Sequence, residues 1–136
     1  MNDFDLSALD SIVDAQENGV DIEILHPGTG EPLGMKFHVV GQDSKPFIKA
    51  RRKVVSARMG KRAISRKDPE KLERDGLETL ACCVVSWSTG GEPGIKLDGE
   101  VLDCNPENVM KVFERFPFIR EQVDEVVGDR AAFLTK

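Results

Sequence analysis

The sequence predicts an α+β fold that is mainly α-helical, with an N-terminal antiparallel β-hairpin and a second small hairpin. Apolar and polar residues alternate in Val20–Ile24 and in Met35–Val39, and a period of two is typical of strands. Between them, His26–Gly34 holds three glycines and two prolines, which indicates a connecting loop. Asp98-Gly99, inside Ile95–Leu102, predicts a tight two-residue hairpin because the pair supplies the positive φ of a type I′ turn.

The chain of 136 residues fits one domain, residues 19–136, preceded by an N-terminal arm, residues 1–18. The arm is predicted to be a short amphipathic helix, capped by Asp5 or Ser7, or a flexible segment. Its shared face carries Leu6, Leu9, Val13 and Gln16. Terminal segments are often loosely held, so a partner could be needed to order this one.

Two helices are predicted in the middle of the chain. Asp43 or Ser44 caps the first, which Gly60 weakens by about 1 kcal/mol relative to alanine. Its apolar stripe is thin and consists of Phe47, Ala50, Val54 and Ala57. Asp68-Pro69 opens the second, which is predicted to continue as the core helix through Trp87. Its apolar positions are Leu77, Leu80, Ala81, Cys83, Val84 and Trp87.

The C-terminal third is predicted to be helical. Asn105-Pro106 opens a helix, and Pro117 ends it and begins the next. The first carries Val109, Val112, Phe113 and Phe116 on one face, and the second carries Ile119, Val123, Val126 and Val127. Gly128 ends the second helix, and residues 129–134 make a last short turn.

The charge of the chain is divided very unevenly. Residues 44–67 hold ten lysines and arginines and no acid, so their formal charge is +10. The whole chain carries −5, which leaves −15 on the other 112 residues. Such asymmetry selects binding partners but says little about the fold. Three interpretations stay open for this segment: a solvated or self-associating face, a docking surface for an acidic protein, and a nucleic-acid surface. The absence of aromatic residues between Lys49 and Lys67 disfavours the last.

Motifs for catalysis or cofactor binding are missing from the sequence. His26 and His38 are the only histidines, and they lack the close partners that a metal site recruits. Cys82, Cys83 and Cys104 form no C-x-x-C pair, and we interpret the adjacent Cys82 and Cys83 as small core residues. The glycine clusters lack the endings of phosphate-binding loops. We therefore expect a protein without enzymatic activity, cofactor or metal.

The sequence also gives no sign of a membrane span or an export signal. The longest apolar run is far shorter than the roughly 20 residues of a span. The acidic N-terminus lacks a secretory pattern, so we expect a cytoplasmic protein.

Candidate partner-binding residues come from two sets. The basic set is Arg51, Arg52, Lys53, Arg58, Lys61 and Arg62. The aromatic set is Trp87, Phe113, Phe116, Phe118 and Phe133, most of which we expect in the core, with a surplus available for an interface. The N-terminal hairpin, if its edges are free, could also pair with another strand.

An ordered series of motifs resembles a known family. The series begins with Ile24–Gly34 and Gly41–Ser44, and continues with Trp87, Leu97–Glu100, Asn105–Asn108, Phe116–Val123 and Asp129–Leu134. Its order and spacing are similar to those of the tail assembly chaperones of long-tailed, lambda-like bacteriophages. The resemblance covers most of the chain from about Asp21 onward, and no single motif is diagnostic.

The resemblance implies a non-enzymatic homo-oligomer that binds the tape measure protein, the helical ruler of the tail, and keeps it soluble until the tail tube polymerises. It implies a location in the cytoplasm of the bacterial host and absence from the mature virion. It also implies that a frameshifted longer form recruits the tail tube protein, and it transfers no catalytic residue. Two alternatives are a nucleic-acid-binding regulator that uses the basic helix at residues 45–67 and a structural head–tail connector protein.

Overall fold

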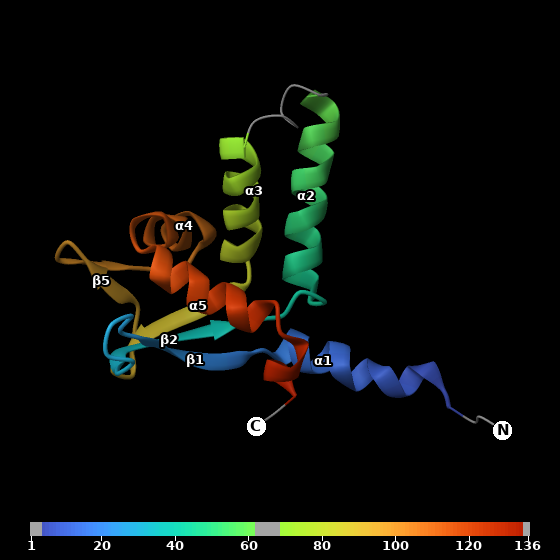
Figure 1. Ribbon diagram of the computed structural model, residues 1–136, viewed down its shortest axis with the longest axis horizontal. Helices are drawn as coiled ribbons and strands as arrows, with labels where there is room; N and C mark the ends of the chain where they lie inside the picture. The colour runs from blue at the N-terminus through green and yellow to red at the C-terminus, as the bar shows by residue number, and fades with distance from the viewer. Residues whose placement is uncertain (1–3, 62–68, 135–136) are drawn as a thin grey trace.

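The computed structural model describes residues 4–61 and 69–134, without the side chains of residues 57–61 and 71. It has the predicted α+β architecture (Figure 1). The elements in chain order are the 3-10 turn η1 (Leu6–Leu9), α1 (Asp10–Asn18), β1 (Val20–Leu25), β2 (Pro32–Val39), α2 (Lys45–Lys61), α3 (Pro69–Ala81), β3 (Val84–Thr89), β4 (Glu92–Pro93), β5 (Ile95–Leu97), β6 (Glu100–Leu102), α4 (Pro106–Arg115), α5 (Pro117–Val127) and the 3-10 turn η3 (Arg130–Phe133).

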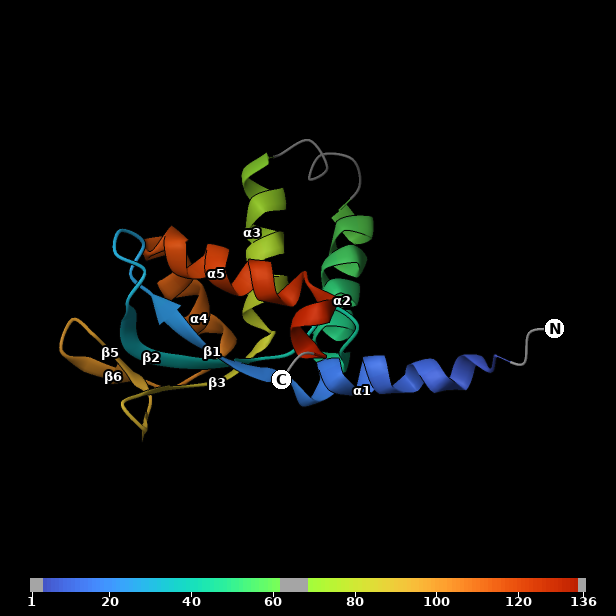
Figure 2. The ribbon, with the colours of Figure 1, turned by 60° about the horizontal axis from the view of Figure 1, so that its bottom comes forward.

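Four antiparallel strands form the main sheet in the order β1-β2-β3-β4, and β5 and β6 form a separate hairpin. The predicted N-terminal hairpin is therefore confirmed as β1-β2. The second hairpin is also confirmed, and both of its turn residues have positive φ, 52° at Asp98 and 86° at Gly99. Helices α3, α4 and α5 lie on one side of the main sheet, while α2 stands beside α3 (Figures 1 and 2).

The core lies between the sheet and these helices. Phe37 on β2 and Trp87 on β3 are paired across the strands, with ring centroids 5.4 Å apart. The helices contribute buried Val109, Val112, Phe113, Ile119, Val123 and Val127. The caps are those that the sequence predicted: the side chain of Asn105 accepts a hydrogen bond from the backbone N–H of Asn108, and prolines begin α4 and α5.

The predicted helix through Trp87 was wrong at its C-terminal end. Helix α3 ends at Ala81, and the chain is extended from Val84 onward as the third strand of the sheet. In the pairing of β3 with β2, Ser86 faces His38 and Val84 faces Val39, so Val85 is an extra residue in a β-bulge. The bulge turns both Val84 and Trp87 toward the core, three residues apart, and this spacing imitates that of a helix.

The N-terminal hairpin is also less open than the sequence suggested. Strand β3 pairs with the second edge of β2, so the outer edge of β1 is the edge of the hairpin without a strand beside it. There, the side chain of Gln122 from α5 accepts a hydrogen bond from the backbone N–H of Leu25 and donates one to its carbonyl, both at 2.8 Å. Part of this edge is therefore occupied by the chain itself, which disfavours edge-to-edge pairing.

Candidate docking surface on helix α2

Helix α2 is attached to the body along a narrow face. At its start, buried Ser44 donates a hydrogen bond from Oγ to the carbonyl of Gly41 at 2.6 Å. Among the described side chains of α2, Ala50 is buried, and Phe47 and Val54 are half-buried. A helix with so thin an apolar stripe leaves most of its circumference open.

Two adjoining hollows lie on this open part of α2. One, of about 900 Å³, is lined by Lys45, Pro46, Ile48, Lys49, Ala50, Arg52, Lys53 and Cys82. The other, of about 370 Å³, is lined by Gln42, Phe47, Ile48, Arg51, Arg52, Val55 and Ser56. Ile48 and Arg52 line both hollows. The two hollows therefore adjoin along these side chains, and we call the combined surface the α2 groove.

The α2 groove combines exposed apolar side chains with positive charge. Ile48 is 37% exposed and Val55 is 44% exposed. Around them stand the exposed bases Lys45, Lys49, Arg51, Arg52 and Lys53. Within the part of the chain that the structure describes, none of these bases forms an ion pair. The groove thus offers an apolar strip with uncompensated positive charge beside it, which is suited to an acidic amphipathic helix.

The thiol in the groove is not a reactive group. Burial raises the pKa of Cys82, with nearby Glu78 adding to the rise and Lys53 opposing it. Burial also raises the pKa of Cys83 to about 12 and that of Cys104 to about 11. All three therefore stay protonated near neutral pH, where only a thiolate would act as a nucleophile.

The two histidines have structural roles in turns and strands. Nδ1 of His26 accepts hydrogen bonds from the backbone N–H groups of Gly28 and Thr29, at 2.9 and 3.2 Å. The ring nitrogens of His38 lie 2.7 Å from Asp21 Oδ1 and 2.9 Å from the carbonyl of Asn18. Among the described residues, no group of three His, Cys, Asp or Glu side chains is placed to hold a metal ion.

The predicted partner-binding residues fall into three places. Arg51, Arg52 and Lys53 are exposed on the α2 groove. The side chains of Arg58 and Lys61, and the whole of Arg62, lie outside the described residues. Of the aromatic set, three residues are buried in the core: Trp87, Phe113 and Phe133.

Because they are buried, these three aromatic residues do not contribute to an exposed contact surface. Trp87 is buried against Phe37, and its indole N–H donates to the carbonyl of Leu102 at 3.0 Å. Phe113 and Phe133 are as deeply buried as the rest of the core. The sequence could not separate them from the exposed surplus, because an aromatic residue on an apolar helix face serves a core and an interface equally well.

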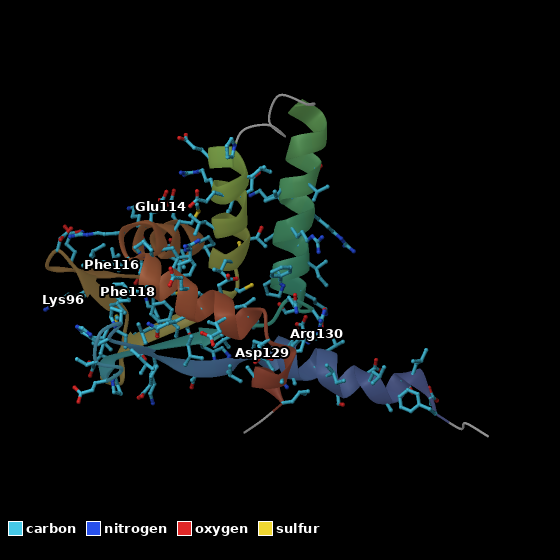
Figure 3. The ribbon with its side chains drawn as sticks, in the orientation of Figure 1. Lys96, Glu114, Phe116, Phe118, Asp129 and Arg130 are labelled. Atoms are coloured by element: carbon cyan, nitrogen blue, oxygen red, sulfur yellow. The ribbon has the colours of Figure 1, made fainter. Side chains whose placement is uncertain are left out.

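Phe116 and Phe118 are half-buried at the junction of α4 and α5. Their rings meet edge to face with centroids 6.1 Å apart, and the guanidinium of Arg115 lies 5.4 Å from the centre of the Phe116 ring. Figure 3 shows both rings on the side of the molecule near β5, away from α2. The described members of the basic set, which lie on α2, therefore do not meet Phe116 and Phe118 in one site.

Sequence reasoning missed the apolar part of the α2 groove. Ile48 and Val55 lie off the buried stripe of the helix, and Pro46 and Cys82 line the hollow beside them. The available signal was their spacing: Ile48 and Val55 are seven residues apart, which places them two turns apart on one face. This second, exposed pair is easily overlooked in the sequence because the segment around it is dominated by lysines and arginines.

The comparisons with known proteins add no relative. No protein-family model matches the chain, and neither a curated protein nor a solved structure matches it. None of the helices in the described ranges combines the length and apolar character that a membrane span requires.

Proposed function

We propose that this protein is a tail assembly chaperone of a long-tailed bacteriophage, which binds the tape measure protein and keeps it soluble in the host cytoplasm until the tail tube polymerises. The observation that carries the proposal on the structural side is the α2 groove, where exposed Ile48 and Val55 lie among bases that form no ion pair with any described residue. The resemblance of the motif series supports the identity of the client.

The groove suits a helical client for a physical reason. A long ruler helix exposes apolar stripes that aggregate when they are left in water. Ile48 and Val55 are spaced to contact such a stripe over two turns, about 10.5 Å of helix. The surrounding bases attract a client segment with acidic flanks and raise the rate of encounter. Each occupied stripe lowers the concentration of the aggregation-prone free client by mass action.

Co-expression of the chain with the tape measure protein from the same genome tests the proposal. The expected result is a soluble client with the wild-type chain and an insoluble client with Ile48→Asp or with Lys49→Glu/Arg52→Glu. Val101→Asp and Lys96→Glu/Lys111→Glu are the matched controls, because these side chains are exposed on other elements and the charge changes are equal. A client that is equally insoluble with and without the wild-type chain would refute the proposal.

The row of exposed bases also favours a second candidate, a nucleic-acid-binding regulator. Bases on one helix can follow phosphates, and each contact adds affinity that falls as salt rises. The apolar strip in the groove favours a protein ligand instead, because phosphates gain nothing from Ile48 or Val55. Unchanged anisotropy of labelled oligonucleotides at about 50 mM salt removes this candidate.

A further inference from the structure

The N-terminal arm is an exposed amphipathic helix that leaves the body. η1 and α1 together run beyond the base of α2 and project outward in both views (Figures 1 and 2). Near its C-terminal end the arm is attached through the fully buried Gln16 and through Ala15, which packs against the core. Leu6, Leu9 and Val13, which the helical spacing places on the same face, are 72%, 42% and 42% exposed.

The charge of the arm is opposite to that of α2. Before Gly19 the chain contains five acids, Asp3, Asp5, Asp10, Asp14 and Glu17, and no lysine or arginine. Asp10 and Asp14 are exposed and lie one turn apart on α1. The arm is therefore an apolar stripe with acidic flanks, while the α2 groove is an apolar strip with basic flanks.

We infer that the arm of one copy docks in the α2 groove of a second copy. The charges are complementary, and the dimensions agree. The 13 residues of η1 and α1 span about 20 Å, and the 17 residues of α2 span about 25 Å. The arm does not reach the groove of its own chain, because it points away from α2 in both views.

The two contacting surfaces are different, so the contact is heterologous. Each copy that offers its arm still has an empty groove, and association continues from copy to copy into a closed ring or an open chain. A contact made by one helix face is at the small end of specific interfaces, below about 1,200 Å², so assembly depends on concentration. The inference goes beyond the proposed function, because the occupant is a second copy of the chain, which competes with a client for the same groove.

Charge reversal on the full-length chain tests the contact. Asp10→Lys/Asp14→Lys reverses two of the five acids of the arm, and Lys49→Glu/Arg52→Glu reverses two of the five bases of the groove. Glu121→Lys/Glu125→Lys is the matched control for the arm variant, since it makes the same charge change at the same spacing on exposed positions of α5. All of the substituted side chains are exposed, and circular dichroism with the fluorescence of the single Trp87 checks that each variant is folded.

Sedimentation velocity from low micromolar to near millimolar concentration gives the readout. The wild type and the α5 control are expected to shift to larger species as concentration rises, while each reversed variant stays monomeric at low salt. An equimolar mixture of the two variants is expected to form dimers, because the unchanged arm of the groove variant meets the unchanged groove of the arm variant. Leu9→Ser/Val13→Ser, which keeps the charge, is expected to stay monomeric.

A wild-type chain that remains monomeric throughout the range would overturn the inference. So would reversed variants that assemble like the wild type, or a mixture of folded reversed variants that stays monomeric. These outcomes leave the co-expression result untouched, so failure of the self-association and failure of the proposed function are distinguishable.

Discussion

The attachment of the arm depends on a buried side-chain amide more than on an ion pair. Gln16 Nε2 donates to Asp43 Oδ2 at 2.8 Å, and Gln16 Oε1 accepts from the backbone N–H of Asp43 at 2.9 Å. Arg130 adds an exposed bidentate pair, from Nε to Asp43 Oδ2 at 2.6 Å and from Nη2 to Oδ1 at 3.0 Å. Figure 3 shows Arg130 near the C-terminal end of α1 and the N-terminal end of α2.

The magnitudes separate the two contributions. Asp43→Ala keeps the backbone N–H that Gln16 Oε1 accepts from, but it leaves Nε2 of the fully buried Gln16 with only a long contact to the carbonyl of Ile12, at 3.4 Å. An unsatisfied buried donor destabilises by about 1–3 kcal/mol, whereas an exposed ion pair contributes about 1 kcal/mol or less. We expect Asp43→Ala to lower the free energy of unfolding by about 2–4 kcal/mol, and Arg130→Ala and Asp43→Asn to lower it clearly less.

Urea denaturation followed by Trp87 fluorescence measures these differences, because the only tryptophan lies in the core. Arg115→Ala is the control, since it removes a similar exposed bidentate pair with Asp98 that has no buried amide behind it. If Arg130→Ala destabilised the protein as much as Asp43→Ala, the reasoning from the buried amide would be refuted.

The same carboxylate gives a pH dependence of known sign. The hydrogen bond from Arg130 holds the pKa of Asp43 below its usual value of 3.8, against the opposing effect of burial. The ionised group therefore contributes its full stability above about pH 4, and the contribution is lost as pH falls through the lower folded-state pKa. The difference in stability between the wild type and Asp43→Asn is expected to close in acid.

Three further predictions concern the core and the turns. Gly94→Ala is expected to destabilise the protein by more than about 1 kcal/mol in thermal unfolding, because Gly94 has φ +88° and an added Cβ would lie 2.6 Å from Val101 Cγ1. Gly30→Ala is the control for the strain of positive φ alone, since a Cβ added at Gly30 meets nothing within 4 Å. Trp87→Phe is expected to destabilise by about 1–3 kcal/mol in urea unfolding followed by circular dichroism, since it leaves the carbonyl of Leu102 without its 3.0 Å donor; an unchanged midpoint would contradict that role. The raised thiol pKa values of Cys82, Cys83 and Cys104 predict slow modification by a thiol reagent at about pH 8 in the native protein and rapid modification of all three in denaturant; fast native labelling would contradict the raised pKa values.

Local signals predicted most of the fold. The Asn105 cap, the prolines that begin α4 and α5, and the Asp98-Gly99 turn each act within a few residues, so the sequence alone contains their physical cause. The prediction for the segment of strand β3 was wrong because its burial depends on pairing with β2, which is distant in the sequence. The bulge at Val85 exists only in that pairing, and no local pattern distinguishes it from a helix.

The candidate site was predictable in its charge but not in its shape. The basic residues of α2 are evident from composition, whereas the exposure of Ile48 and Val55 depends on which narrow face of the helix meets the core. The arm shows the same limit. Gln16 shares a helical face with Leu9 and Val13, yet it is the polar residue that is buried, because only Gln16 reaches Asp43.

This junction connects the arm to the geometry of the inferred assembly. Residues Gln42–Lys45 lead directly into α2, and Gln16 and Glu17 of α1 bond to Asp43 and to the backbone N–H of Lys45. The polar contacts at Asp43 therefore fix the angle between the arm and the groove of the same chain. In a head-to-tail contact that angle sets the rotation from one copy to the next, and with it the choice between a closed ring and an open chain. Asp43→Ala keeps both docking surfaces but loosens the angle, so we expect a broader range of assembly sizes in sedimentation velocity, with Arg115→Ala unchanged from the wild type. A sharp, wild-type distribution for a folded Asp43→Ala variant would show that the angle is set elsewhere.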